Sequence, residues 1–572
     1  MDRRAFAYLV PYWRRLVLVL VISLISTATT LVIPYLSKDL IDRALIGRDL
    51  GALQNIVGWF IALGVLGFVL NVTSGLRYTR VSAEILFDMR LALYAHLQRL
   101  SPRFYAKTRL GDIVSRLNND ISEIQRVAAE AALAWVGNVL FLAGSLVMML
   151  WLDWRLALVA LAPLPISLIA LGVYRRRLES RVADLRQRSA DIGSFLIETL
   201  QATSLVVSSN AQEREQQRFR GLNGAFIDSL MQMQRVTYFA GGLPGTVLAV
   251  GSAVAFFYAG LRVIEGTLTL GTMGAFLAYQ MRVFAPAQAL MGLWASLTTA
   301  KVSWSRVQEM LDANVDVIQA ADAQGLTSPT GEIAFDAVTL ATDRQAKVLD
   351  AVSFAARPGQ TVAIVGGSGV GKSTIAYLAT RLLDPDSGTV RLDGHDLRHL
   401  TLDSVRRHVV LVEQEPTLLH ATIEENIRYV RPSASIGEVK AAAEAAGIAR
   451  FVDGLPNGYA TMVGERGLAV SAGERQRIAL ARAFLADPAV LVMDEPTAAL
   501  DAIAQRQVID GSRAVMRNRT TILITHRREV AMAADHVVVL DGATVVDAGP
   551  PDALAVRSAA FARLFEITLS SV

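Results

Sequence analysis

The stretch TVAIVGGSGVGKST, residues 361–374, decides the fold of the second half of the chain. An apolar run is followed by a glycine-rich turn and then by residues that can start a helix. Gly366, Gly371, Lys372 and Ser373 match the pattern G-x-x-x-x-G-K-[ST] in that setting. Glycines let backbone N–H groups approach phosphates, and a helix N-terminus adds a favourable dipole. The stretch therefore predicts a P-loop domain of the α/β class that binds a nucleoside triphosphate.

The chemistry of this loop assigns roles to its residues. Lys372 is expected to bridge the β- and γ-phosphates, and the Ser373 hydroxyl to bind Mg²⁺. The predicted ATP-binding residues are Gly366, Gly367, Ser368, Gly369, Val370, Gly371, Lys372, Ser373 and Thr374.

A second element supports the same site. The apolar run Val490–Met493 reads as a buried strand and ends in Asp494 and Glu495. A carboxylate at a strand end beside a nucleotide can hold Mg²⁺, usually through water, and a second one can orient the attacking water. An isolated Asp–Glu pair is more often a solvated pair, but here it follows a strand in a chain that already carries a P-loop.

The composition places the other half of the chain in a membrane. Of 572 residues, 52% are hydrophobic and 19% charged, and the length favours two or three domains. There are no cysteines, which excludes disulfides and thiolate chemistry. A net charge of +4 gives no case for nucleic-acid binding.

Six apolar stretches are predicted to be transmembrane helices, because a helix needs ~20 mostly apolar residues to cross a bilayer. Five lack any charged residue and the sixth is broken only by Arg282; they are 16–37, 50–76, 131–152, 156–174, 236–261 and 268–297. The cytoplasmic segments 77–130 and 175–235 are predicted to continue the spans as helices, with turns near 102–110 and 208–217. We expect an all-α transmembrane domain at 1–312, a linker at 313–330 and the nucleotide-binding domain at 331–572.

Basic residues predict the orientation. Arg3, Arg4, Arg14 and Arg15 precede the first span, and a second Arg cluster begins at Arg175, after the fourth. The positive-inside rule therefore places both termini in the cytoplasm. No cleavable signal peptide is expected, and the Ala- and Arg-rich composition is typical of a bacterial cytoplasmic membrane protein.

The segment VSAGERQRIALARAFLADPAVLVMDEPTAALD, residues 470–501, resembles the signature-to-Walker-B block of ABC transporters. Gln414 resembles their Q-loop, TMVGERG (461–467) their exporter-specific loop, Ala498–Asp501 their D-loop and His526 their switch histidine. FYAKTRLGDIVSRLNNDI (104–121) and GTLTLGTMGAF (266–276) resemble exporter membrane segments. The likeness covers the whole chain and implies an exporter-type half-transporter.

The resemblance also implies roles. Glu495 would be the catalytic base, Gln414 would sense Mg²⁺, and His526 would hold the γ-phosphate and the attacking water. Ser471 and Gly473 would contact the γ-phosphate held by a second subunit. Mg²⁺ would be bound by Ser373, Gln414 and Asp494. One chain carries six spans and one ATPase domain, so the working unit would be a dimer, with a homodimer favoured over a heterodimer.

Two positions depart from the family pattern. The usual signature LSGGQ is VSAGE here, so Ala472 adds a methyl group where backbone approaches phosphate and Glu474 adds negative charge. This is either neutral drift or the mark of one half of a heterodimer. The aromatic residue on which the family stacks adenine is replaced by Thr342, with Arg344 as a candidate substitute.

Arg282 is the one full charge within a predicted span, and such charges usually face a cavity or a partner. We hypothesise that a set of nearby residues lines a cavity for an amphiphilic, anionic substrate: Gln280, Arg282, Phe284, Gln288, Met291 and Trp294. The alternative is a structural pair of Arg282 with a residue on another helix or with the backbone.

The function expected is ATP-driven export of an amphiphilic drug, lipid or peptide by alternating access. An importer with exporter architecture, of the siderophore-uptake kind, and an ATP-gated channel or regulator are the alternatives. Glu495 and His526 are the residues that complete ATP hydrolysis would need, and their presence disfavours the channel.

Overall fold

The computed structural model describes residues 4, 7–341, 346–464, 470–496, 512, 513, 516 and 519–565. It divides the chain into two compact units, one of residues 1–95 and 111–312 and one of residues 96–110 and 313–572. The second unit thus contains a short piece of the chain that the sequence assigned to the membrane half.

The first unit is helical. Its long helices are α2 (Trp13–Asp39), α3 (Leu50–Leu97), α6 (Ile121–Leu152), α8 (Pro163–Gln201), α10 (Gln212–Ile264) and α11 (Leu270–Leu311). Shorter elements are the 3₁₀ turn Val10–Tyr12, the π-helical segments Leu40–Ile46 and Arg116–Asp120, α5 (Leu110–Ser115), α7 (Trp154–Leu161) and α9 (Thr203–Ser208).

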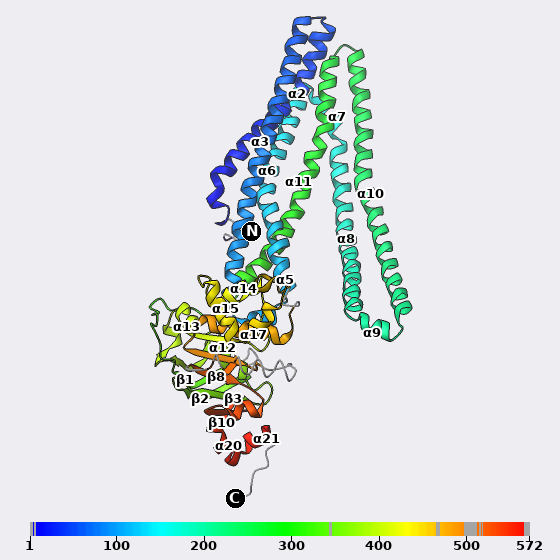
Figure 1. The fold of residues 1–572 in the computed structure, drawn as a ribbon. Coiled ribbons are helices and arrows are strands. Elements are labelled where there is room, and N and C mark those ends of the chain that lie inside the picture. The colour runs from blue at the N-terminus through cyan, green and yellow to red at the C-terminus, as the bar shows by residue number, and fades with distance from the viewer. Residues whose placement is uncertain are drawn as a thin grey trace. The chain divides into compact units, whose positions relative to one another are not determined.

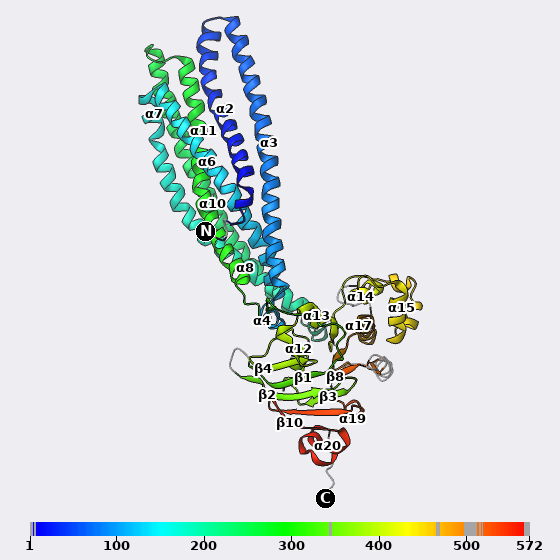
Figure 2. The same cartoon turned by 90° about the vertical axis from the view of Figure 1, so that its left-hand side faces the viewer.

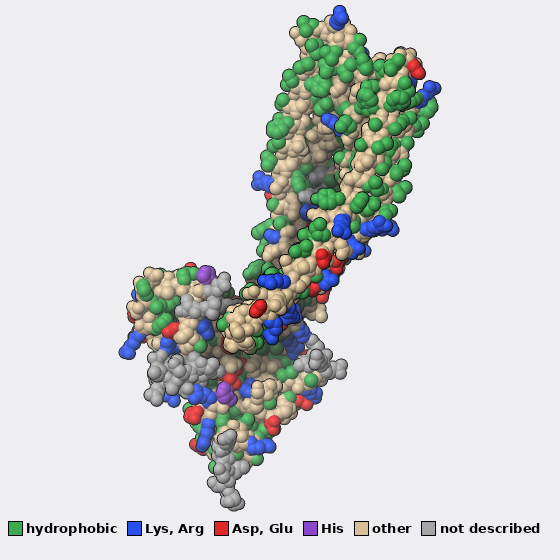
Figure 3. Space-filling view, turned by 90° about the vertical axis from the view of Figure 1, so that its right-hand side faces the viewer, with side chains coloured by type: hydrophobic (Ala, Val, Ile, Leu, Met, Phe, Trp, Pro, Cys, Tyr) green, Lys and Arg blue, Asp and Glu red, His purple; other side chains and the backbone are tan. Residues whose placement is uncertain are grey.

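Five of the described helical runs are long and apolar enough to cross a membrane, by length and composition. Four of them contain the predicted spans 16–37, 50–76, 156–174 and 236–261, and the run Ala134–Leu152 covers the predicted span 131–152 except for its first three residues. The sixth predicted span lies in α11 and is helical, but its membrane crossing stays a prediction. Figure 3 shows hydrophobic side chains over the upper part of this unit, while charged side chains gather on its lower part.

Helix pairs organise the first unit. Helix α8 packs along α10, and α11 packs along α6 and α2; Figure 1 shows α8 and α10 as a hairpin closed by α9. Close approach depends on small residues: a Cβ on Gly251 would lie 2.2 Å from Pro163, and one on Gly144 would lie 2.6 Å from Leu31.

The predicted cytoplasmic extensions are helical, since α3 runs to Leu97 and α10 begins at Gln212. The second turn lies between α9 and α10, at the start of the predicted range 208–217. The short helix α9 precedes the predicted range 208–217, most of which is the start of α10. The chain reverses at Asn210, whose φ of 49° is a left-handed conformation that Asn tolerates.

Polar residues fasten one end of these helices. The Asp153 side chain caps α7 by accepting from the Leu156 N–H at 2.9 Å, and it also pairs with Arg262. Asp42 accepts from the Gly271 N–H at 2.8 Å and from the Thr269 hydroxyl at 2.6 Å. The first and last long helices are thereby joined at one end.

The second unit contains two sheets. The six-stranded sheet has the order β10-β9-β3-β8-β7-β6, and the four-stranded antiparallel sheet the order β2-β1-β4-β5. Apolar residues of both sheets and of α12 (Lys372–Ala379) form one core cluster, and Figure 2 shows the layers from the side.

The strands are β1 (Ile333–Ala341), β2 (Lys347–Ala356), β3 (Thr361–Gly366), β4 (Ser387–Leu392), β5 (His395–Asp396), β6 (Val409–Val412), β7 (Val490–Asp494), β8 (Thr520–Ile524), β9 (His536–Asp541) and β10 (Thr544–Gly549). The helices besides α12 are α4 (Pro102–Lys107), α13 (Leu402–His408), α14 (Ile423–Arg428), α15 (Ile436–Ala445), α16 (Ala449–Asp453), α17 (Ala472–Ala486), α19 (Arg528–Met532), α20 (Pro551–Arg557) and α21 (Ala559–Leu564), with 3₁₀ turns at Leu397–His399 and Gly458–Ala460.

Candidate functional site: a nucleotide site at the strand ends and a polar cavity between helices

The P-loop joins β3 to α12, as the sequence predicts. Gly369 and Gly371 have φ of 79° and 95°, a conformation that favours glycine. A Cβ on Gly366 would lie 2.6 Å from the Leu540 carbonyl oxygen, so the loop also needs glycine there for space. The Lys372 ammonium donates to the Gly366 and Gly367 carbonyls at 3.0 and 2.7 Å, which folds it over the loop where phosphates would lie.

Parallel pairing brings the other predicted residues to the same edge. Strand β8 pairs with β3 and β7, and β7 pairs with β6, all in parallel. Their carboxyl ends therefore meet, and ligands bind at such an edge in open α/β sheets. Gln414 follows β6, Asp494 and Glu495 end β7, and His526 follows β8.

Two of these side chains, His526 and Gln414, contact the same carboxylate oxygen of Glu495. Nδ1 of His526 lies 3.0 Å from Oε2 of Glu495, and Nε2 of Gln414 donates to the same oxygen at 3.4 Å. Glu495 has a φ of 43°, and its N–H donates to the Ile524 carbonyl at 3.0 Å. A non-glycine residue held in this region costs about 1–3 kcal/mol and often marks a functional position.

Asp494 and Ser373 form an oxygen pair beside the P-loop. Burial and the neighbouring Glu495 raise the pKa of the Asp494 carboxyl, opposed by a hydrogen bond from Ser373 and by the Lys372 charge. Mg²⁺ is bound by one or two protein oxygens together with phosphates and water, so this hydroxyl–carboxylate pair fits it. Among the described residues, no three His, Cys, Asp or Glu side chains form a metal cluster, so the phosphates would have to complete the site.

Glu413 is a third carboxyl at this edge that sequence reasoning missed. Partial desolvation and the nearby Asp494 raise its pKa. It directly precedes Gln414, and its place after β6 was the signal that could have found it.

The altered signature starts α17. Ser471 is the N-cap: its hydroxyl accepts from the Glu474 N–H, and the Glu474 carboxylate accepts from the Ser471 N–H at 2.7 Å. Ser471 and Ala472 are exposed, whereas Gly473 is buried. Within the described part of the chain, Ser471 and Gly473 make no hydrogen bond to the P-loop.

Several predicted positions lie outside the described residues. They are Thr342, Arg344, the end of the segment 461–467 and the D-loop residues Ala498–Asp501.

A cavity of about 680 Å³ lies between α2, α3, α6 and α11 in the first unit. Its polar lining residues come from all four helices and are Ser23, Ser26, Thr27, Thr30, Asn71, Ser74, Asn138 and Arg282. Arg282 has no ion pair or hydrogen bond to any residue that the structure describes. The structural pair considered as an alternative is therefore not found in that part of the chain.

Three other residues of the predicted substrate set do not line this cavity, and two lie outside the described side chains. Gln280, Phe284 and Gln288 are absent from its lining, and the side chains of Met291 and Trp294 are not described. The error has a simple cause: positions 281, 282, 285 and 286 share one face of α11, and the chosen neighbours fall on others. The missed signal is in α2, where Ser23, Ser26, Thr27 and Thr30 form a hydroxyl stripe at spacing i, i+3, i+4, i+7.

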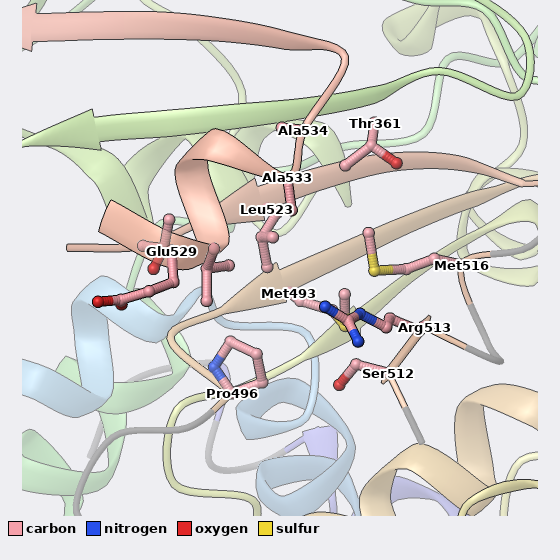
Figure 4. A pocket seen from close by; sticks show the side chains of 12 residues that line it. Thr361, Met493, Pro496, Ser512, Arg513, Met516, Leu523, Glu529, Ala533 and Ala534 are labelled. Atoms are coloured by element: carbon pink, nitrogen blue, oxygen red, sulfur yellow. The ribbon is translucent and has the colours of Figure 1, made fainter. Parts of the chain in front are cut away.

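A smaller cavity of about 140 Å³ lies behind the strand ends in the second unit. Figure 4 shows Pro496, which follows Glu495, together with Met493, Leu523 and Ser512 around it. The buried Ser512 hydroxyl has no hydrogen-bond partner among the residues that the structure describes. The walls that the described residues form are mostly apolar.

Comparisons with known proteins agree with the fold and the site. The profile described as ABC transporter transmembrane region matches residues 16–287, and the profile described as ABC transporter matches residues 349–498. The chain belongs to the ABC transporters, as an exporter-type half-transporter in which a membrane domain is fused to an ATP-hydrolysing domain.

Similar proteins share nearly the whole chain. The uncharacterized ABC transporter ATP-binding protein YknV of Bacillus subtilis is 31% identical over 570 residues, 99% of this chain and 94% of that protein. The ATP-dependent lipid A-core flippase of Chromobacterium violaceum is 30% identical over 573 residues, 99% and 97% of the two chains. A solved bacterial Atm1-family ABC exporter with ATP bound has a TM-score of 0.78 and 27% identity, covering 98% of this chain and 99% of its own. The protein is thus a multi-pass membrane ATPase coupled to export, which acts with another ABC subunit.

Proposed function

We propose that this exporter moves an amphiphilic compound with an anionic headgroup from the cytoplasm or the inner leaflet. The observation that carries the proposal is Arg282 in the polar cavity. Following α11 from Leu270, it lies about 18 Å along the helix at 1.5 Å per residue. A charge at such a depth is costly unless it faces a cavity or a partner, and it marks substrate pathways.

The cavity chemistry supports a headgroup with acceptor oxygens. Guanidinium presents five donors and binds carboxylate or phosphate in a two-pronged geometry. The hydroxyls of Thr27 and Thr30 donate within α2, to the Ser23 and Ser26 carbonyls at 2.9 and 3.1 Å, so they offer acceptor lone pairs to the cavity. An anion with its own hydroxyl or amide donors would use both kinds of group. A relative named as a lipid A-core flippase is consistent with a lipid-like cargo.

The residues of the nucleotide site suit ATP hydrolysis, because some would position the phosphates and others would orient the water and accept its proton. P-loop backbone N–H groups and Lys372 would hold the phosphates. Glu495 would accept a proton from the water that attacks the γ-phosphorus, and His526, 3.0 Å from Glu495, would orient that water. The bond between the γ-phosphorus and the bridging oxygen breaks, leaving ADP and phosphate. When bound through Ser373, Asp494 and Gln414, Mg²⁺ would neutralise developing phosphate charge.

We further propose that two copies of this chain form the transporter in a bacterial cytoplasmic membrane, with both termini in the cytoplasm. Each P-loop would then face Ser471 and Gly473 of the other copy. The intact capping box at Ser471 supports this, because VSAGE preserves the helix N-terminus that a phosphate would approach.

The substrate class is tested with matched amphiphiles. The purified protein in lipid nanodiscs is given dodecyl phosphate, dodecyl phosphocholine or dodecyl trimethylammonium, each below its micellar concentration, and ATP turnover is measured. We expect only the anionic compound to stimulate turnover, and Arg282→Gln to remove that stimulation while leaving basal turnover unchanged. Equal stimulation by all three, or by the cationic compound alone, would reject the proposed class.

A further inference from the structure

A cavity of about 340 Å³ in the second unit lies between α4 and the nucleotide-binding fold. One wall is α4, with Arg103, and the other is formed by the end of β1, the start of β2 and α12. Leu340, Val348, Leu383 and the ring of Tyr377 make much of the surface apolar, and Tyr377 belongs to α12 rather than to the end of β1. The cavity is therefore suited to a flat, largely apolar group rather than to a phosphate.

The cavity begins where the P-loop ends. Thr374 lines it and lies two residues beyond Lys372, in the first turn of α12. Val348, another lining residue, touches the loop: a Cβ on Gly371 would lie 2.7 Å from the Val348 carbonyl oxygen. A nucleotide whose phosphates occupy the P-loop has its nucleoside within reach of this space.

Arg103 is fixed at the point where the chain departs from the family pattern. Its Nη2 donates to the Ala341 carbonyl at 3.4 Å, and Ala341 is the last residue of β1. The next residue in sequence is Thr342, which stands where related transporters have a stacking aromatic residue. Guanidinium is planar, and nucleic-acid bases stack on arginine planes much as they do on aromatic rings.

We propose that the adenine of ATP binds in this cavity, with the Arg103 guanidinium replacing the missing aromatic residue as its stacking partner. Arg103 belongs to α4, which joins α3 to α5 in the chain. Base recognition thus uses a residue of the membrane half of the sequence. ATP binding then depends on the position of α4 against the nucleotide-binding fold. Bound ATP in turn stabilises α4 in that position.

The test compares ATP with a ligand that has no base. The full-length Glu495→Gln protein in nanodiscs holds ATP without turnover, and binding of labelled ATP and of inorganic tripolyphosphate is measured at equilibrium. Arg103→Ala is expected to weaken the binding of ATP by about 3- to 10-fold, since stacking with the base is lost. The binding of tripolyphosphate, which has no base, should be unchanged. Arg109→Ala, a loss of the same charge at an exposed position beyond α4, is the matched control and should change neither.

Arg103→Lys separates stacking from charge and from folding. Lysine keeps the charge but has no planar group, so the affinity for ATP should fall nearly as much as it does with alanine. Wild-type ATP affinity in Arg103→Lys or Arg103→Ala would overturn the proposal. So would an equal loss for ATP and tripolyphosphate, because that pattern means Arg103 only holds α4 in place.

Discussion

Nδ1 of His526 lies 3.0 Å from Oε2 of Glu495, although 31 positions separate the two residues in the numbering of the chain. The parallel pairing of β7 with β8 produces this contact, since Asp494 is opposite Ile524 in the register. Glu495 directly follows β7 and has a φ of 43°, a conformation that is uncommon for a residue other than glycine. The sheet thus places the proposed base, Glu495, and the proposed orienting group, His526, next to each other.

Glu495→Gln should abolish turnover while preserving ATP binding. The amide keeps the shape of the side chain but cannot accept a proton, and loss of a general base costs about 10²- to 10⁴-fold in rate. Phosphate release and ATP binding are measured on the same nanodisc sample. Glu415→Gln, in the same loop region as Gln414, is the control; turnover above a tenth of wild type in Glu495→Gln would rule out its role as base.

Gly371→Ala should destabilise the second unit and prevent ATP binding. The new Cβ would lie 2.7 Å from the Val348 carbonyl, which adds about 1–3 kcal/mol of overpacking to about 1–2 kcal/mol of left-handed strain. Gly359→Ala has a positive φ of 74° but no atom within 4 Å of its Cβ, so it carries the strain alone. Thermal unfolding and ATP binding compare the two, and equal effects would contradict the steric argument.

Asp42→Ala should loosen the joint between α11 and the π-helical segment Leu40–Ile46. It removes acceptors for the Gly271 N–H and the Thr269 hydroxyl, worth about 1.5–3 kcal/mol for hydrogen bonds to a charged group. Asp49→Ala loses one local bond, to the Ala52 N–H at 3.0 Å, and should have a smaller effect. The melting temperature in detergent is the measurement. A larger fall in melting temperature for Asp49→Ala than for Asp42→Ala would contradict the proposed role of Asp42.

Stability should fall as the pH drops below about 6.5, in part because of His536. Desolvation and the nearby Arg357 lower the pKa of its imidazole in the folded chain. The unfolded chain therefore binds the proton first as pH falls, and protonation favours unfolding. Chemical unfolding between pH 5 and pH 8 is the measurement, and His536→Gln should flatten the slope. An unchanged slope would show that other groups control it.

The nucleotide site could be predicted from sequence because its parts are local. The phosphate loop is one strand, one turn and one helix start, so Gly371 and Lys372 follow from spacing alone. Gln414 and His526 were identified through the resemblance to ABC transporters, and the rule that parallel strands end at one edge explains why they lie beside Glu495. The strained backbone of Glu495 could not be predicted from the strand pattern, because it depends on the packing around this residue.

The Arg282 cavity and the Arg103 cavity could not be predicted, because the first arises between four helices and the second between α4, two strand ends and α12. Arg282 was found as a lone charge in an apolar run, but the hydroxyl stripe of α2 becomes informative only once it faces α3, α6 and α11. Arg103 lies 239 positions before Thr342 in the numbering and looks like an ordinary basic residue of a cytoplasmic turn. Only the docking of α4 beside β1 gives it a nucleotide-facing position.

The central claim, ATP-driven export of an anionic amphiphile through the Arg282 cavity, is tested most directly by transport into inside-out vesicles. Vesicles containing the protein are mixed with a fluorescent dodecyl phosphate derivative and ATP, and the fluorescence enclosed is followed. We predict ATP-dependent accumulation that is lost in Glu495→Gln and in Arg282→Gln, with ATP turnover retained in Arg282→Gln. Accumulation of the probe in Arg282→Gln at the wild-type rate, or ATP-dependent loss of the probe from preloaded inside-out vesicles, would contradict the account.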